Sequence, residues 1–163
     1  MSKKWNVPAP LILAIMETES SFNPLARSHV PAFGLMQIVP GSAGRDATAL
    51  VYGRERLLTA QELYQVDTNI EMGAAYLHIL DQRYLRAITN PQSRRYCVIA
   101  AYNTGAGNVA RAFTGKNAVG PAAAIINRMT PAQVFDHLVK HLPFQETRDY
   151  MHKVTRALPT YMA

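Results

Sequence analysis

Several features that would define a protein class are scarce or missing in this 163-residue sequence. The single cysteine, Cys97, excludes an internal disulfide bond. No apolar run approaches the ~20 residues that a membrane-spanning helix needs, and the run at residues 9–16 is short and interrupted by Pro10. The chain also lacks a glycine-rich phosphate loop followed by Lys and Ser or Thr, and it lacks a Gly-x-Ser-x-Gly nucleophile elbow. The sequence therefore does not favour a nucleotide-binding loop or a serine hydrolase of these types.

Acidic residues are also in short supply. Asp and Glu number 11 against 17 Lys and Arg, so the net charge is +6 and the pI is ≈ 9.7. Such a balance favours an anionic partner, such as nucleic acid, phospholipid or an acidic cell-wall polymer. The basic residues are spread along the chain, whereas a nucleic-acid surface more often shows a dense stripe, so we expect no nucleic-acid partner.

Metal ligands are sparse as well. Five histidines include one pair at helical i,i+4 spacing, His137 and His141, but no nearby Glu or Cys completes a zinc set. We therefore predict no metal site and no cofactor. Cys97 lies in an apolar stretch that is typical of a buried small residue rather than a catalytic thiol.

What is present is a globular, mainly helical pattern. Hydrophobic residues make up 48% of the chain and charged residues 17%, which fits one domain over residues 1–163 with a substantial core. Asp67 and Ser93 are expected helix N-caps, and Thr130 with Gln133 forms a capping box. Helical segments are predicted at about residues 10–20, 67–80, 96–102, 122–129, from 131, and 145–158.

Two segments have less regular patterns. Residues 26–34 are expected to form a loop, and the short apolar piece 35–39 is either strand-like or a helical turn. The segment 44–65 follows no clear period, although Thr59 and Glu62 match a capping box for a short helix.

Glu19 is the first candidate for chemistry. Helical spacing places it on the same face as Ile12, Ile15 and Met16. A carboxyl group on such a face is partly desolvated, which raises its pKa and suits it to act as a general acid. The alternative is a helix-end glutamate that reaches solvent, as expected for Glu17.

Amide and aromatic side chains beside glycine turns are further candidates. Gln37 follows the Gly34 turn, where it is either a loop-bonding amide or a ligand for a sugar group. Tyr102 and Asn103 precede Gly105, and the alternative for this pair is a helix C-cap. Together with Glu19 these residues indicate a carbohydrate cleft served by one carboxylic acid.

Four stretches, in this order, resemble the lytic transglycosylase family, which consists of bacterial peptidoglycan-cleaving enzymes. They are Glu19-Ser20-Ser21-Phe22-Asn23-Pro24, Gly34-Leu35-Met36-Gln37-Ile38-Val39-Pro40, Ala101-Tyr102-Asn103-Thr104-Gly105-Ala106-Gly107 and Leu142-Pro143-Phe144-Gln145-Glu146-Thr147-Arg148-Asp149-Tyr150. The stretch Ser93-Arg94-Arg95-Tyr96 is similar to the membrane-bound type C branch. The resemblance covers about residues 10–158.

The resemblance implies a lysozyme-like, mainly α fold, of the α+β lysozyme class, with a saccharide-binding cleft. It also implies that Glu19 protonates the bond between N-acetylmuramic acid and N-acetylglucosamine. The same group, once ionised, would take the proton from the sugar's own 6-hydroxyl, which closes on C1. A 1,6-anhydro end then forms without water, so the second carboxylate of ordinary glycosidases is not needed.

By motif position the resemblance assigns supporting and substrate-binding roles to eight further residues. Ser28 matches a serine that helps the 6-hydroxyl attack, and Gln37 a glutamine near the acetamido group. Val39 stands where many relatives have methionine. The full expected set is Ser28, Met36, Gln37, Val39, Tyr102, Asn103, Glu146 and Tyr150.

The sequence is compatible with two other functions. A goose-type lysozyme-like hydrolase would need a second carboxylate, for which Asp46, Asp67 and Glu146 are candidates. A non-catalytic peptidoglycan-binding module is disfavoured by the presence of Glu19.

The resemblance also implies a partner and a place. Peptidoglycan strands are the expected partner of a monomer located in the periplasm or cell envelope. Because residues 1–4 are not followed by a secretory h-region, we expect an excised domain, a membrane anchor outside this chain, or delivery by a phage or secretion apparatus.

Overall fold

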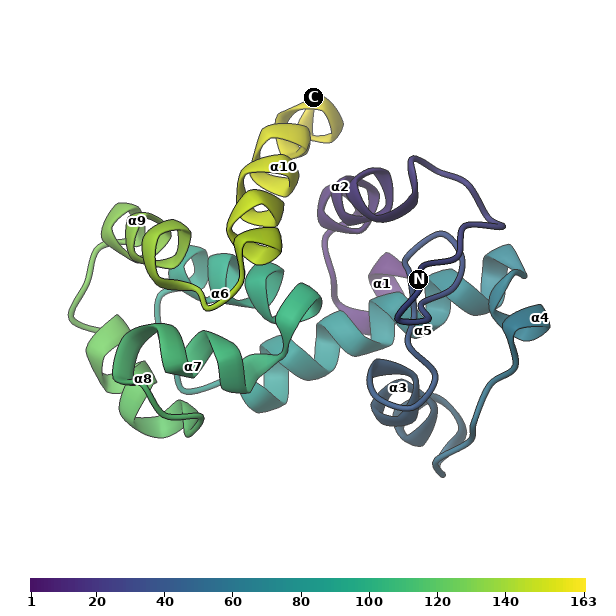
Figure 1. The fold of residues 1–163 in the computed structure, drawn as a ribbon, viewed down its shortest axis with the longest axis horizontal. Helices are drawn as coiled ribbons and strands as arrows, with labels where there is room; N and C mark the ends of the chain where they lie inside the picture. Colours follow the sequence, from purple (N-terminus) through teal and green to yellow (C-terminus); the bar gives the residue numbers. More distant parts are fainter. The chain divides into compact units, whose positions relative to one another are not determined.

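The computed structural model describes residues 1–163, and they divide into two compact units (Figure 1). Unit 1 comprises Met1–Ile79 and Ala157–Ala163, and unit 2 comprises Leu80–Arg156. Both units are helical, and the β pairing is limited to two isolated bridges, Arg27 with Phe33 and Phe33 with Ile38. The mainly α prediction is confirmed. No helix combines the length and apolar character that crossing a membrane requires.

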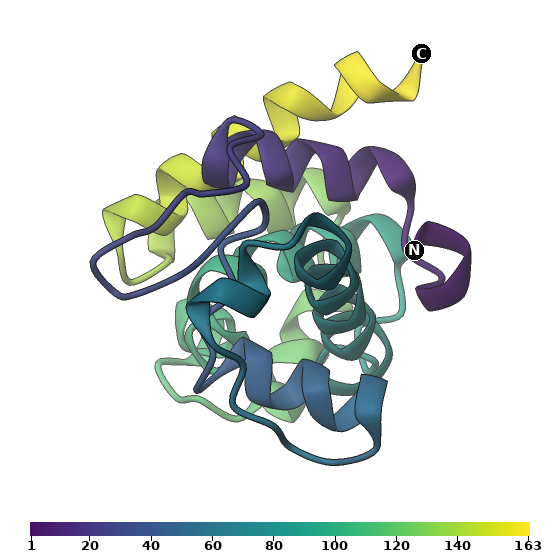
Figure 2. The same cartoon turned by 90° about the vertical axis from the view of Figure 1, so that its right-hand side faces the viewer.

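Unit 1 is organised around one central helix (Figure 2). The helix α5 contacts α1, α3 and α4, and its buried residues include Gly73, Ala74 and Ala75, whose small side chains let neighbouring segments approach closely. The helices of this unit are α1 (Ser2–Trp5), α2 (Ala9–Ser20), α3 (Ala43–Tyr52), α4 (Ala60–Leu63) and α5 (Val66–Ile79).

Unit 2 is built around α6, which packs against η1, α7 and α9. The buried stretch of α6 includes Cys97, as predicted from its apolar surroundings. The elements are the π-helical turn η1 (Leu80–Tyr84), α6 (Pro91–Thr104), α7 (Ala106–Thr114), α8 (Val119–Ile126), α9 (Pro131–His141) and α10 (Gln145–Met162). The helix α10 continues past Arg156, so its last turns belong to unit 1.

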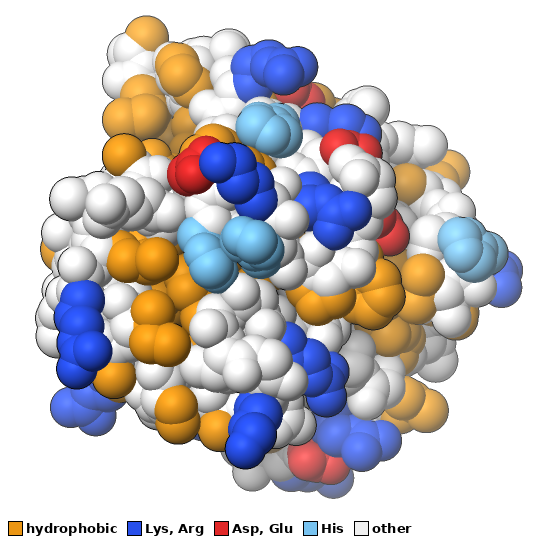
Figure 3. Space-filling model, turned by 60° about the vertical axis from the view of Figure 1, so that its left-hand side comes forward, with side chains coloured by type: hydrophobic (Ala, Val, Ile, Leu, Met, Phe, Trp, Pro, Cys, Tyr) orange, Lys and Arg blue, Asp and Glu red, His pale blue; other side chains and the backbone are white.

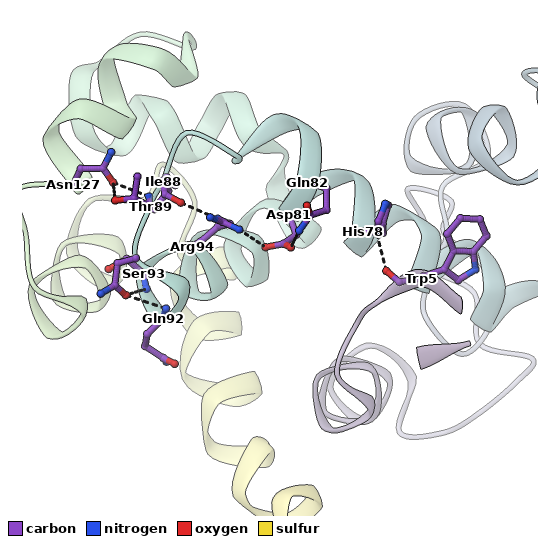
Figure 4. A network of polar contacts seen from close by, with 11 residues as sticks. Trp5, His78, Asp81, Gln82, Ile88, Thr89, Gln92, Ser93, Arg94 and Asn127 are labelled. Carbon is purple, nitrogen blue, oxygen red and sulfur yellow. Dashed lines mark hydrogen bonds and ion pairs between the residues drawn. The ribbon is translucent and has the colours of Figure 1, made fainter. Parts of the chain in front are cut away.

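Two predicted caps are wrong. The helix α5 begins at Val66, so Asp67 lies in its first turn, where a negative charge favours the helix dipole. The helix α6 is capped by Asn90, whose side chain accepts hydrogen bonds from the backbone N–H groups of Gln92 and Ser93. These two donor residues are labelled in Figure 4. An asparagine followed by proline starts this helix, because proline needs no N–H partner in the first turn.

Other local predictions are confirmed. Both capping boxes form, Thr59 with Glu62 at α4 and Thr130 with Gln133 at α9. The helix α2 has a proline in its first turn, and residues 26–34 form a loop. The piece 35–39 is a turn closed by the bridge at Ile38, rather than a strand or a helix.

The net positive charge belongs to one of the two units. Unit 2 has 11 Lys and Arg against 4 Asp and Glu, a net +7, whereas unit 1 has 6 against 7, a net −1. Figure 3 shows a face on which Lys and Arg side chains lie near histidines and outnumber the acidic side chains. Any attraction for an anionic partner therefore arises from unit 2.

Candidate functional site

The last turn of α2 carries Glu19. Ile12, Ile15 and Met16 are buried on the same face of the helix, whereas Glu17 is exposed and Glu19 is half-buried. The expected difference between the two glutamates is therefore present in the structure. Glu19 lies at the border between the apolar core of unit 1 and solvent.

The backbone directly after α2 is strained. Ser21 and Phe22 both have positive φ angles, 50° and 62°, a conformation that costs non-glycine residues about 1–3 kcal/mol each. The turn is held by two backbone hydrogen bonds, Ser21 N–H to Glu17 O at 2.9 Å and Asn23 N–H to Ser20 O at 3.0 Å. A strained backbone of this kind persists only where the surrounding structure enforces it, and such positions cluster at functional sites.

Ser20 connects two of the predicted motifs. Its hydroxyl lies 2.7 Å from the carbonyl oxygen of Leu35 and 3.1 Å from that of Met16, both as acceptors. The residue that follows Glu19 is thus hydrogen-bonded to the turn that contains Gln37. The structure brings these two sequence stretches together within unit 1.

Gln37 is a loop-bonding amide. Its Nε2 donates to Ala26 O at 3.1 Å and to Gly34 O at 3.0 Å, and its own backbone has a φ of 50°. Both amide hydrogens therefore stabilise the loop that precedes the turn. The half-buried side chain keeps Oε1 as the atom able to accept a bond from a sugar amide or hydroxyl.

Ser28 lies in the same loop. Its Oγ accepts the backbone N–H groups of Ala32 at 2.9 Å and Val30 at 3.3 Å. Both bonds use the oxygen as acceptor, so the O–H hydrogen remains a donor. Val39, at the end of the Gly34 turn, is half-buried.

Asn69 is a supporting residue that the sequence argument missed. It is 1% exposed on α5, where Oδ1 accepts Met36 N–H at 2.8 Å and Nδ2 donates to Phe33 O and Leu63 O, each at 2.8 Å. The sequence offered one signal for Asn69, namely a polar residue placed one helical turn before Met72 and Gly73. Two of these bonds hold the backbone on either side of the Gly34 turn, and the third reaches the end of α4.

Met36 is completely buried and packs against α5. A Cβ at Gly73 would lie 2.2 Å from the Met36 sulfur, so the two residues are complementary in size. Met36 thus anchors the Gly34 turn to α5 by packing in the core. Its predicted contribution to substrate binding stays a prediction.

The remaining predicted site residues lie in unit 2. Tyr102 and Tyr150 are buried, whereas Glu146 is exposed in the first turn of α10. Asn103 is half-buried, and its Oδ1 accepts the hydroxyl of Thr147 at 2.8 Å. Two of the matched stretches, at the end of α6 and the start of α10, are therefore bonded to one another.

Unit 2 also contains Cys97, His137 and His141, for which no functional role was predicted. Burial raises the pKa of the Cys97 thiol to about 12, which keeps it in the un-ionised, unreactive form. His137 stacks on Phe113 with ring centroids 4.4 Å apart, and its Nε2 lies 2.6 Å from Ala112 O. His141 lies 4.4 Å from His137, and no group of three or more His, Cys, Asp or Glu side chains able to hold a metal ion is present.

Solved structures define the class of fold. The lytic transglycosylase Slt from Pseudomonas aeruginosa, in an inactive mutant with glutamate replaced by glutamine, is 31% identical with a TM-score of 0.70. The match covers 98% of this chain and 22% of that one. A 70-kDa soluble lytic transglycosylase in complex with bulgecin A is 30% identical with a TM-score of 0.72, covering 99% of this chain and 22% of that one. The fold is lysozyme-like, as in these enzymes.

The family is shown by the sequence match. Residues 1–125 match the Transglycosylase SLT domain, and the chain belongs to this family. It is 48% identical over 160 residues to the membrane-bound lytic murein transglycosylase C of Klebsiella pneumoniae subsp. pneumoniae and 47% identical to that of Salmonella typhimurium. These matches cover 98% of this chain, which spans 44% of the length of either relative.

Proposed function

We propose that this protein cleaves peptidoglycan as a lytic transglycosylase. The bond cut is the β-1,4 bond between N-acetylmuramic acid and N-acetylglucosamine, and no water is consumed. The half-buried Glu19, on the last turn of an apolar helix in a chain of this family, is the observation that carries the proposal. That a Glu-to-Gln mutant of the Pseudomonas enzyme is inactive agrees with chemistry that depends on one carboxyl group.

Glu19 acts in both halves of the reaction. As an acid it gives its proton to the glycosidic oxygen while the bond from that oxygen to C1 of the muramic residue breaks. The muramic 2-acetamido group stabilises the cation-like C1. Glu19, now ionised, takes the proton of the 6-hydroxyl as O6 bonds to C1, so the carboxyl group returns to its starting state and a 1,6-anhydro end is left.

The neighbouring side chains assist this step from within unit 1. The Ser28 hydroxyl, still able to donate, orients the attacking 6-hydroxyl. The Oε1 atom of Gln37 accepts from the acetamido group, because its Nε2 is already bonded to the loop. Val39 shapes the sugar subsite. Tyr102, Asn103, Glu146 and Tyr150 contact the glycan.

The charge distribution fits an acidic wall polymer. Unit 2 carries a net +7, which attracts the carboxylates of peptide stems at long range. Peptidoglycan lies outside the inner membrane, so the proposal places the protein in the periplasm or cell envelope. We further propose that the protein binds peptidoglycan as a monomer and that any membrane anchor lies outside this chain.

The test is a digest of purified sacculi, with products separated by chromatography and identified by mass spectrometry. The wild type is expected to release muropeptides with 1,6-anhydro ends, which are one water lighter than hydrolysed ends. Glu19→Gln should abolish release while glycan binding persists, and Glu55→Gln, at an exposed glutamate of the same unit, is the matched control.

Other outcomes have defined meanings. Reducing ends would make the protein a lysozyme-like hydrolase and would direct attention to Asp46, Asp67 and Glu146. No release by the wild type, with sacculi still bound, would favour the binding module. Turnover by Glu19→Gln near the wild-type rate would refute the assignment of the acid.

A further inference from the structure

The last turn of α10 places an aromatic side chain against the end of α2, within unit 1. The Tyr161 hydroxyl donates to Glu17 Oε1 at 2.5 Å. The Tyr161 ring meets Phe22 edge-on, with centroids 6.4 Å apart and planes at 78°. One side chain therefore contacts residues on both sides of the strained turn.

The two contacts bracket Glu19. Glu17 lies two residues before it, in the last turn of α2, and Phe22 lies three residues after it. Between them lie Ser21 and the unfavourable left-handed backbone. A contact at each end limits how far this segment can relax, and the carboxyl group of Glu19 moves with the segment.

We propose that Tyr161 is a positioning residue that holds the α2 terminus in the geometry that Glu19 needs. The inference rests on the proposed function for its link to catalysis. Tyr161 acts through Glu17 and Phe22, not through the glycan. It belongs to none of the four stretches that resemble the lytic transglycosylases, so the motifs do not reveal it.

The chemistry of the contact favours positioning over simple packing. Glu17 is exposed and Phe22 is 42% exposed, so the contact lies at the surface of unit 1 rather than in its apolar core. A hydroxyl bonded to a carboxylate is short and directional, and it fixes geometry more than it adds burial. The bond to Glu17 also raises the pKa of Tyr161, so the hydroxyl remains a donor throughout the neutral range.

Amide hydrogen exchange tests the positioning directly. Tyr161→Phe removes only the hydroxyl, Tyr161→Ala removes both contacts, and Glu17→Gln removes the charge of the acceptor. The amides of residues 19–23 should exchange about threefold faster in Tyr161→Phe, the effect expected for losing one exposed, solvent-screened hydrogen bond, and faster still in Tyr161→Ala. Tyr52→Phe is the matched control, because this tyrosine of unit 1 contacts Arg56 through its ring alone.

Kinetics on soluble glycan strands test the link to catalysis. Tyr161→Phe should lower kcat about fivefold with KM within about twofold, the pattern of an interaction that acts only in the transition state. Glu17→Gln keeps a neutral acceptor for the hydroxyl and should lower kcat less. The double variant should be no slower than Tyr161→Phe alone, because both changes act on the same hydrogen bond.

The outcomes separate the two proposals. Unchanged exchange at residues 19–23 in Tyr161→Ala would overturn the positioning role, whatever the activity. Faster exchange with unchanged kcat would overturn its link to catalysis. The proposed function is tested by the products of the wild type alone, and reducing ends or no product would refute it. The exchange data would still show whether Tyr161 holds the turn.

Discussion

The Thr147 hydroxyl donates to the Oδ1 of Asn103 at 2.8 Å and thereby joins the first turn of α10 to the last turn of α6. Thr147 is 1% exposed, so the bond is shielded from water on the threonine side. It orients an amide that belongs to the proposed glycan-binding set. Sequence similarity alone assigned a role to Asn103 but none to Thr147.

Replacing Thr147 by valine should weaken glycan cleavage. The change keeps the shape but removes the donor that orients Asn103 Oδ1, a hydrogen bond worth about 1 kcal/mol. We expect kcat/KM on glycan strands to fall about fivefold if this orientation is needed for cleavage, since about 1.4 kcal/mol is a factor of ten. Thr147→Ser keeps the hydroxyl and should remain close to wild type. Equal rates for the valine and serine variants would show that the bond does not matter.

Alanine at Gly34 should cost far more stability than alanine at Gly53. Both glycines have positive φ angles, 80° and 76°, so the backbone penalty of about 1–2 kcal/mol is shared. A Cβ at Gly34 would lie 2.2 Å from Asn69 Nδ2 and 2.4 Å from Leu63 O, whereas nothing lies within 4 Å at Gly53. We expect a loss of about 3 kcal/mol or more for Gly34→Ala in urea unfolding. Similar losses at the two sites would contradict the crowding argument.

The capping box of α4 should make stability depend on pH. The backbone hydrogen bond from Thr59, with help from Arg56, holds the pKa of Glu62 below its usual range. A depressed pKa in the folded state means that the stabilisation is present above the unfolded pKa, about 4.3, and is lost as the pH falls through the folded value.

The measurement compares the free energy of unfolding of wild type and Glu62→Gln across that range. The variant should be less stable at pH 7, and the difference should shrink below about pH 4. Glu55→Gln, which removes an exposed carboxylate with no capping bond, is the control. A difference that stays constant from pH 7 to about pH 3 would rule out ionisation of Glu62 as its source.

The Cys97 thiol should be inert in the native protein. Its pKa of about 12 leaves almost no thiolate at pH 8, so reaction with a disulfide reagent should be about 1,000-fold or more slower than in guanidinium. Cys97→Ala should leave glycan cleavage intact. A folded Cys97→Ala variant without activity would show that the thiol has a function.

Local signals were sufficient for part of the fold. The two capping boxes, at Thr59 and Thr130, and the start of α10 at Gln145 were predicted because each depends on neighbouring residues alone. The helix end expected at Gly105 is also confirmed, because Gly105 caps α6 with a φ of 88°. The sequence did not show that α7 begins at once at Ala106 and includes Gly107.

The segment 44–65 shows the limit of periodicity. It contains α3 (Ala43–Tyr52), whose buried residues are only Gly44, Ala47 and Thr48. Small side chains of this kind give little contrast between an apolar and a polar face. The helix is instead specified by its contact with α5, which the sequence does not display.

The sequence by itself determined the helical class, the family and the choice of Glu19 as the proposed acid, because these depend on residue types and spacings within short stretches. The tertiary structure decided which residues hold that glutamate and its neighbours. Asn69 bonds to Met36 across 33 residues, and Tyr161 bonds to Glu17 across 144. A hydrogen bond over such separations exists only after the chain has folded, so no local pattern encodes it.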